Sequence, residues 1–306
     1  MKILVTGSEG VIGQTLVPFL RTQGHEVVGF DIRNSLTEDI TDSDAVYAAI
    51  LGYHDKCPFD VVIHMAAQVG RITGEEAPNL SVRSNVTGTL NIVRACSESG
   101  TFLINFSTSE VLGHNSDEAT GQPDILAQNG IYGLTKLAAE GIVKHYVDTY
   151  GLRAISIRPY MVYGAHEVPN GVYRSAISNF ISAAHRGIPY VAHKGCVRSW
   201  CYVDDFCEGI ERVLYWRSRG LFTSGYEAFP IGTEEYRSME EAAEIVKRVV
   251  GRGEYTVKEP PAQLMSTVKR ADFSRIKDLG FQPKVNLEEG VKQTYEWMLK
   301  AGVLAA

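Results

Sequence analysis

The chain has 306 residues, 44% of them hydrophobic, and a net charge of −6. That apolar content suffices for one large domain or two unequal ones. The acidic balance, with no basic run, argues against nucleic acid or an anionic membrane surface as a partner. No stretch approaches the ~18 apolar residues of a membrane span, and the first predicted strand begins at residue 2. We therefore expect a cytoplasmic protein without a signal peptide.

The five cysteines form no C-x-x-C pair, which is typical of reduced thiols in a cytoplasmic protein. The eight histidines show no metal-ligand spacing, so we expect no metal.

The first segment combines a strand, a glycine turn and a helix. Residues 2–5 are a short apolar run, followed by Gly7, Gly10 and Gly13 in the spacing G-x-x-G-x-x-G, and then by a helical apolar pattern up to Leu20. The glycines permit a tight turn and a close approach of the backbone to a pyrophosphate at the helix N-terminus. In this context, the pattern predicts a dinucleotide-binding site.

A second apolar strand, residues 25–30, ends at Asp31. A carboxylate at this point can accept hydrogen bonds from an adenosine ribose diol and would repel a 2′-phosphate. Asp31 therefore favours NAD, although Arg33 leaves NADP as a less favoured alternative.

Strands alternate with helical stretches through the first half of the chain. The predicted strands lie near residues 2–5, 26–30, 61–64, 102–106 and 153–158. This alternation predicts an α/β fold with a doubly wound parallel sheet of the Rossmann type. The pattern changes after residue 164, and we expect residues 1–164 plus about 198–232 to form the nucleotide-binding domain. A smaller, discontinuous α/β domain for the substrate would comprise about 165–197 plus 233–306.

Tyr132 and Lys136 lie four residues apart in a predicted helix, so their side chains share one face. A nearby ammonium lowers the pKa of a phenol from its usual value of about 10. The pair is therefore suited to exchanging a proton with an alcohol near neutral pH.

Several motifs in order make the chain resemble the extended short-chain dehydrogenases/reductases, the group of nucleotide-sugar epimerases, dehydratases and decarboxylases. The matching segments are Thr6–Gly13, Asp39-Ile40, His64–Ala67, Asn85–Thr89, Ser107–Val111, Tyr132 with Lys136, Arg158-Pro159, Arg198–Asp205, and Lys269-Arg270 ahead of Asp272.

This resemblance implies NAD as the cofactor and a set of residues that would bind it. They are Gly7, Gly10, Val11, Ile12, Gly13, Asp31, Ile32, Arg33, Asp39, Ile40, Met65, Ala66, Ala67, Asn85, Tyr132, Lys136 and Pro159.

The resemblance also implies the chemistry. Tyr132 would take a proton from a sugar hydroxyl, usually at C4, Lys136 would bind the nicotinamide ribose, and Thr108 would position the reacting oxygen. Ser109 and Glu110 follow Thr108 as in UDP-glucuronate decarboxylases, whereas 4,6-dehydratases have Asp-Glu there. A carboxylate beside a keto-sugar can act as a base or orient a departing group.

Arginines are the candidate ligands of a substrate diphosphate, because their planar guanidinium matches phosphate geometry. By resemblance, these are Arg198 and Arg270, and Arg71 and Arg174 are further candidates. One departure concerns Met161, which stands where the family usually has an asparagine that contacts the substrate. Methionine cannot replace that hydrogen bond, so the residue indicates an unusual substrate or pose.

We therefore expect an NAD-dependent enzyme that acts on a nucleotide sugar through a transient 4-keto intermediate, by epimerisation or decarboxylation. A net dehydrogenase or keto-reductase for a sugar or sugar acid without a nucleotide is the alternative, and a non-catalytic NAD-binding regulator is a second one. By analogy with the family, we expect a homodimer.

Overall fold

Six parallel strands form the central sheet of the computed structural model, which describes residues 1–52, 59–117, 122–125, 128, 130–168, 175–261 and 267–304. In sheet order, the strands are β10 (Glu227–Ile231), β5 (Ala154–Pro159), β4 (Phe102–Phe106), β3 (Val61–His64), β1 (Lys2–Thr6) and β2 (Glu26–Phe30). Every residue of β3 and β4 is buried, as expected for strands covered on both faces.

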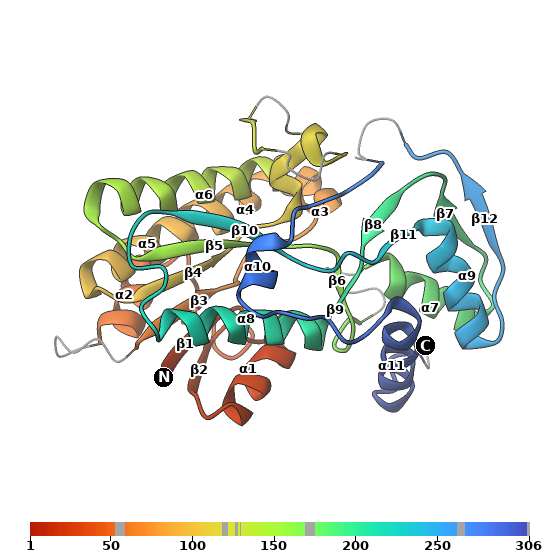
Figure 1. Cartoon of the computed structure of the whole chain (residues 1–306), viewed down its shortest axis with the longest axis horizontal. Coiled ribbons are helices and arrows are strands. Elements are labelled where there is room, and N and C mark those ends of the chain that lie inside the picture. Colours follow the sequence, from red (N-terminus) through yellow and green to blue (C-terminus); the bar gives the residue numbers. More distant parts are fainter. Residues whose placement is uncertain are drawn as a thin grey trace.

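Helices cover both faces of this sheet (Figure 1). On one face α1 (Gly13–Thr22) packs against α8 (Val203–Arg217), and on the other α5 (Thr89–Ser99) packs between α2 (Ser43–Leu51) and α6 (Ile131–Tyr150). Short helices complete this part: α3 (Arg71–Glu76), α4 (Pro78–Val82), the π-helix η1 (Arg83–Gly88) and the 3-10 helix η2 (Ser109–Asp117). The predicted doubly wound α/β fold is confirmed.

Strand β1 has β2 on one side and β3 on the other, so the chain reverses its winding direction at this point of the sheet. In such sheets, ligands bind outside the carboxyl ends of the strands at the reversal. All five predicted strands are present, but β10 was not predicted. It contains Pro230, which an edge strand tolerates and which weakens the strand pattern in the sequence.

The rest of the chain forms short two-stranded sheets and helices, most of which lie to the right in Figure 1. The elements are β6 (Val162–Tyr163), α7 (Ala176–Arg186), β7 (Tyr190–His193), β8 (Val197–Ser199), β9 (Cys201–Tyr202), β11 (Tyr236–Ser238), α9 (Met239–Val250), β12 (Tyr255–Lys258), α10 (Ser274–Asp278) and α11 (Leu287–Lys300). The division into two domains at the expected residues stays a prediction.

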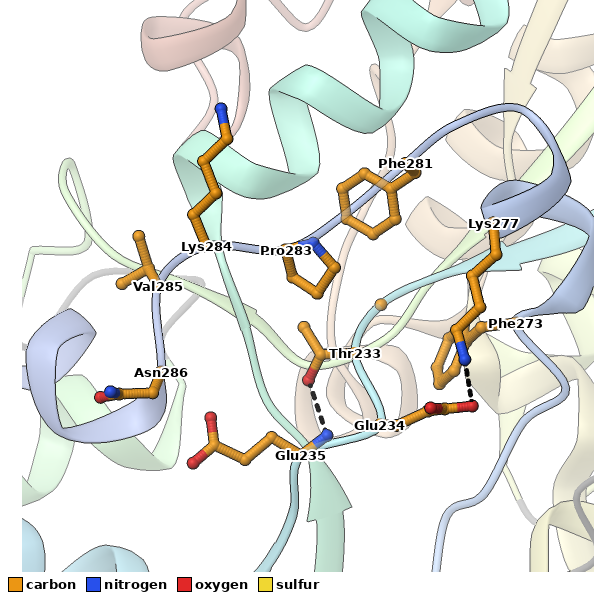
Figure 2. Close-up of a pocket in the computed structure, with 11 residues that line it drawn as sticks. Thr233, Glu234, Glu235, Phe273, Lys277, Phe281, Pro283, Lys284, Val285 and Asn286 are labelled. Atoms are coloured by element: carbon orange, nitrogen blue, oxygen red, sulfur yellow. Dashed lines mark hydrogen bonds and ion pairs between the residues drawn. The ribbon is translucent and has the colours of Figure 1, made fainter.

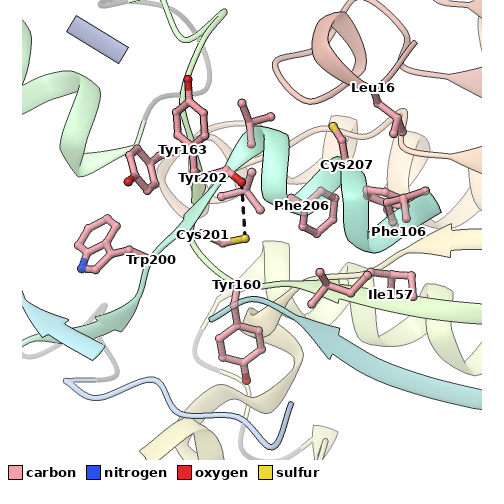
Figure 3. Packing of buried hydrophobic residues seen from close by; sticks show 14 of the residues in the cluster. Leu16, Phe106, Ile157, Tyr160, Tyr163, Trp200, Cys201, Tyr202, Phe206 and Cys207 are labelled. Carbon is pink, nitrogen blue, oxygen red and sulfur yellow. Dashed lines mark hydrogen bonds between the residues drawn. The ribbon is translucent and has the colours of Figure 1, made fainter. Parts of the chain in front are cut away.

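One hydrophobic core runs from the sheet into this second part (Figure 3). Ile157 of β5 and Phe206 of α8 belong to the same cluster as Trp200, whose ring meets Tyr163 edge-on at 6.1 Å. Continuous packing of this kind fixes the strand ends of the sheet relative to the segments that face them.

The four described cysteines, Cys96, Cys196, Cys201 and Cys207, are buried thiols, and Cys57 lies outside the described residues. Within the described ranges, no His, Cys, Asp or Glu residues gather in a group of three that could hold a metal. None of the described helices combines the length and apolar character needed to cross a bilayer.

Candidate active site

The glycine turn between β1 and α1 is closely packed. Gly7 has a φ of +74°, and a Cβ there would lie 2.7 Å from the nitrogen of Ala66. A Cβ on Gly13 would lie 2.4 Å from the carbonyl oxygen of Gly7. No side chain caps α1 at Ile12, and its first turn holds no acidic residue. No side chain therefore occupies the start of this helix, whose positive end suits a pyrophosphate.

Asp31 follows β2 beside this turn. Its carboxylate accepts hydrogen bonds from the N–H groups of Glu9 and Arg33, each at 2.9 Å. Because an ionised carboxylate has about four acceptor positions, capacity is left for the two hydroxyls of a ribose. The Arg33 guanidinium donates to the Glu9 carbonyl at 2.6 Å, so it lies along the turn, and Ile32 is exposed.

Asp39 and Ile40, two of the residues predicted to bind the cofactor, lie in the segment between β2 and α2. The Asp39 carboxylate accepts from the N–H of Thr41 at 2.8 Å. Ile40 is buried so closely against Gly88 that a Cβ on the glycine would lie 2.6 Å from it.

Asn85 connects the loop after β3 to the helix that carries the predicted catalytic pair. Its amide bonds both backbone groups of Gln68, at 2.8 and 3.0 Å, and donates to the Thr135 hydroxyl on α6 at 3.1 Å. Its polar atoms therefore position the loop that begins with Met65, Ala66 and Ala67. The residues of this region fit the role of holding a dinucleotide.

Thr108, Tyr132 and Lys136 meet at the carboxyl end of β4, and each is at most 8% exposed. The Thr108 hydroxyl lies beside the Tyr132 phenol and accepts a hydrogen bond from the Glu110 N–H at 3.3 Å. The Lys136 ammonium donates to the carbonyl of Phe106 at 2.5 Å. Pro159 ends the neighbouring strand β5.

Burial shifts the two predicted proton-transfer groups in opposite directions. It raises the pKa of Tyr132 above its ordinary value, and the Thr108 hydrogen bond opposes this shift. It lowers the pKa of Lys136 to about 8, against the opposing charge of Glu140. The sequence spacing predicts that Lys136 lowers the pKa of Tyr132. In the free protein, burial outweighs any such effect, so the phenol keeps its proton.

His64 ends β3 beneath this region as a neutral, structural residue. Its two ring nitrogens bond the hydroxyls of Thr6 at 2.8 Å and Thr89 at 3.1 Å. Burial lowers the pKa of His64 to about 3, so it carries no charge at neutral pH.

Glu110 forms a buried ion pair with Lys269, which lies far away in the sequence. Burial alone would raise the pKa of Glu110, but the charges of Lys269, Arg71 and Arg198 hold the pKa below its usual value. Glu110 is therefore a carboxylate at neutral pH. Ser109, beside it, is 4% exposed.

Two of the predicted substrate arginines, Arg71 and Arg198, thus lie close to Glu110. Arg270 is exposed, and the adjacent Lys269 makes the contact instead. Sequence reasoning did not select Lys269, because nothing in a Lys-Arg pair indicates which side chain faces inward. Arg174 lies outside the described residues.

A separate pocket of about 340 Å³ lies between the end of β10 and the start of α11 (Figure 2). None of the predicted site residues lines it. Its carboxylates are already engaged, since Glu234 pairs with Lys277 at 2.5 Å and Glu235 accepts from the N–H of Leu287 at 2.8 Å. We therefore place the chemistry at the end of β4 and not in this pocket.

The fold and the glycine turn define a dinucleotide-binding α/β protein, and comparisons with known proteins refine the class. A model of the NAD dependent epimerase/dehydratase family matches residues 3–222. The UDP-glucose 4-epimerase of Mycolicibacterium smegmatis is 28% identical over 314 residues, which cover 97% of this chain and 98% of that protein.

Two further proteins are similar over their whole lengths. UDP-glucuronic acid decarboxylase 6 of Arabidopsis thaliana is 28% identical over 326 residues, covering 99% of this chain and 90% of that protein. The crystal structure of UDP-glucose 4-epimerase with UDP-glucose from Thermotoga maritima has a TM-score of 0.83 at 26% identity, covering 98% of this chain and 99% of that one.

The chain belongs to the NAD dependent epimerase/dehydratase family. This confirms the resemblance drawn from its motifs, the expectation of an enzyme and NAD as the cofactor.

Proposed function

We propose that the protein converts a nucleotide sugar through a transient 4-keto intermediate, by epimerisation or decarboxylation and without net redox change. The observation that carries this proposal is the meeting of three buried side chains at the end of β4, where the Thr108 hydroxyl lies beside the Tyr132 phenol and the Lys136 ammonium donates to the Phe106 carbonyl. The names of the similar proteins, which include epimerases and a decarboxylase of UDP-sugars, support it.

In this function, NAD held at the glycine turn and Asp31 would supply hydride acceptor and donor chemistry at the carbinol carbon of the sugar. Tyr132 takes the hydroxyl proton at its phenolic oxygen and returns it when the ketone is reduced. Thr108 holds the reacting oxygen in line with the phenol, a positioning role. Positive charge near Tyr132 favours the phenolate, and Lys136, one helical turn away, supplies it from the chain.

Glu110 and Ser109 bear on the outcome of the intermediate. Because Lys269 and two arginines keep Glu110 ionised, it has no proton to donate to a departing group. Ser109 has no carboxylic proton to give. A dehydratase needs an acid to expel water, so these residues favour epimerisation or decarboxylation over dehydration.

A net dehydrogenase for a sugar acid without a nucleotide is the second candidate. The observation that favours it is Met161, which occupies a φ of +36° with a side chain that has no hydrogen-bond donor.

The test is turnover of a panel of nucleotide sugars by the NAD-loaded protein. We expect NMR to show a new sugar product while absorbance at 340 nm returns to its starting value, and Tyr132→Phe to lose turnover but keep NAD binding. Lasting accumulation of NADH would select the net dehydrogenase. Equal behaviour of wild type and Tyr132→Phe would refute the assigned role of the phenol.

A further inference from the structure

Lys269 is a lysine whose charge is almost entirely withdrawn from solvent. Its side chain is 2% exposed, and the carboxylate of Glu110 receives its ammonium. The backbone N–H of Lys269 donates to Val197 at 3.1 Å, which fixes its segment beside β8. Burying a charge is costly, and an apolar pair of similar size is often as stable. Its presence here points to a role beyond stability.

The surroundings of this ion pair contain buried polar groups that the described residues leave without partners. They are Nη1 of Arg71 and the second carboxylate oxygen of Glu110. An ammonium has three donor positions, and among the described residues Glu110 is the side chain that engages Lys269. Donors on Arg71 and Lys269 are therefore available to one further anionic group.

The charges around the Lys269–Glu110 ion pair are unbalanced. Arg71, Arg198 and Lys269 are three cations near Glu110, and Glu240, whose charge acts with those of Arg71 and Arg198 on Cys196, is a second carboxylate. Burial lowers the pKa of Lys269 to about 8 even though Glu110 opposes the shift. An added anion would relieve this excess of positive charge.

These charged residues lie beside Thr108 and Tyr132, the proposed site of proton transfer. The Glu110 N–H donates to the Thr108 hydroxyl, which lies beside the Tyr132 phenol. The ammonium held by Glu110 is therefore within one glutamate side chain of the Thr108 hydroxyl, which in the proposed function positions the reacting oxygen. When a pyranose is oxidised at C4, the substituent on the adjacent carbon is closer to this oxygen than a phosphate attached across the ring.

We propose that Lys269, together with Arg71, binds a carboxylate carried by the sugar next to the oxidised carbon, and so selects nucleotide-linked sugar acids. This inference rests on the proposed function. Glu110 is then a positioning residue that holds the ammonium in place. The carboxylate completes a site in which Lys269 already holds one carboxylate group and Nη1 of Arg71 has no partner among the described residues.

The test is calorimetric binding of UDP-glucuronate, UDP-glucose and UDP to the NAD-loaded protein. We expect wild type to prefer the glucuronate over the glucose compound by at least about tenfold, and Lys269→Met to reduce that preference by about 10- to 100-fold. Binding of UDP should change less than about threefold, and Lys269→Arg should retain part of the preference because it keeps the charge.

Lys269→Met leaves Glu110 buried and unpaired, so a folded alternative is needed. The double variant Lys269→Met with Glu110→Gln removes both charges and should show the same lost preference. Lys194→Met, in an exposed ion pair with Glu259, is the control and should bind all three ligands as wild type does.

Equal losses for all three ligands would overturn the inference, because Lys269 would then bind the diphosphate. An unaltered preference in both Lys269 variants would also overturn it. Failure of wild type to bind any of the three, with NAD binding intact, would instead overturn the proposed function.

Discussion

The ion pair between Glu140 on α6 and Arg158 on β5 provides a direct test of how the catalytic helix is held. The guanidinium donates to both carboxylate oxygens, at 2.9 and 2.8 Å, and the side chains are 6% and 14% exposed. Removing one partner of a buried pair costs about 3–5 kcal/mol. Because glutamine retains the shape and one acceptor, we expect Glu140→Gln to cost about 3 kcal/mol, at the lower end of this range.

The same substitution should alter the pH dependence of turnover. The charge of Glu140 raises the pKa of Lys136, which burial lowers to about 8. In the proposed function Lys136 acts as an ammonium, so we expect activity below its pKa and a loss of activity as pH rises through it. Glu140→Gln removes the supporting charge, and the alkaline limb of kcat/KM should move to lower pH.

Two assays check these expectations. Thermal unfolding should show Tm about 5 °C lower for Glu140→Gln, and pH profiles should show the shifted limb. The control is Asp148→Asn, which breaks the exposed Lys144 pair on the same helix and should change stability by less than about 0.5 kcal/mol. Since the pKa of Lys269 is also about 8, the decisive quantity is the difference between variant and wild type in the pH of the alkaline limb. A stability loss under about 1 kcal/mol, or an unmoved limb, would refute the reasoning.

Two further substitutions test local strain and a buried carboxylate. Met161 has a φ of +36°, and asparagine tolerates this region of backbone conformation better than methionine does. Met161→Asn should therefore raise Tm by about 2 °C in thermal unfolding. A lower Tm would contradict this prediction. Burial raises the pKa of Glu167 from 4.5 to about 7, so the folded state binds more protons between these values and stability falls as pH rises through them. Glu167→Gln should flatten this fall in stability, which amounts to about 3 kcal/mol at most. Denaturant titrations from pH 4 to 8 measure the fall, and parallel stability curves for variant and wild type would contradict the prediction.

The parts of the site that depend on neighbouring residues could be predicted from the sequence. Gly7, Gly13 and Asp31 belong to one strand-turn-helix-strand unit, whose geometry follows from residue type and spacing. Tyr132 and Lys136 share a helix face for the same reason. Each of these residues lies in the structure where its local pattern places it.

The contacts between distant segments could not be predicted. Lys269 and Glu110 are 159 residues apart, and no periodicity relates them. In extended chain, adjacent side chains alternate in direction, so a choice between Lys269 and Arg270 requires the register of that segment. The bridge from Val197 to Val268 sets this register, and it exists only in the folded chain.

The charge states of the site follow from burial, which spacing alone does not reveal. Burial disfavours the phenolate of Tyr132 and the ammonium of Lys136 alike, so it drives both groups toward their neutral forms. Proton transfer from an alcohol needs both groups in their charged forms, the phenolate and the ammonium. Glu140 stabilises the ammonium from within the chain, and further positive charge beside the phenol must stabilise the phenolate. In the proposed function, we therefore expect the pair to exchange a proton with the substrate only when the site is loaded.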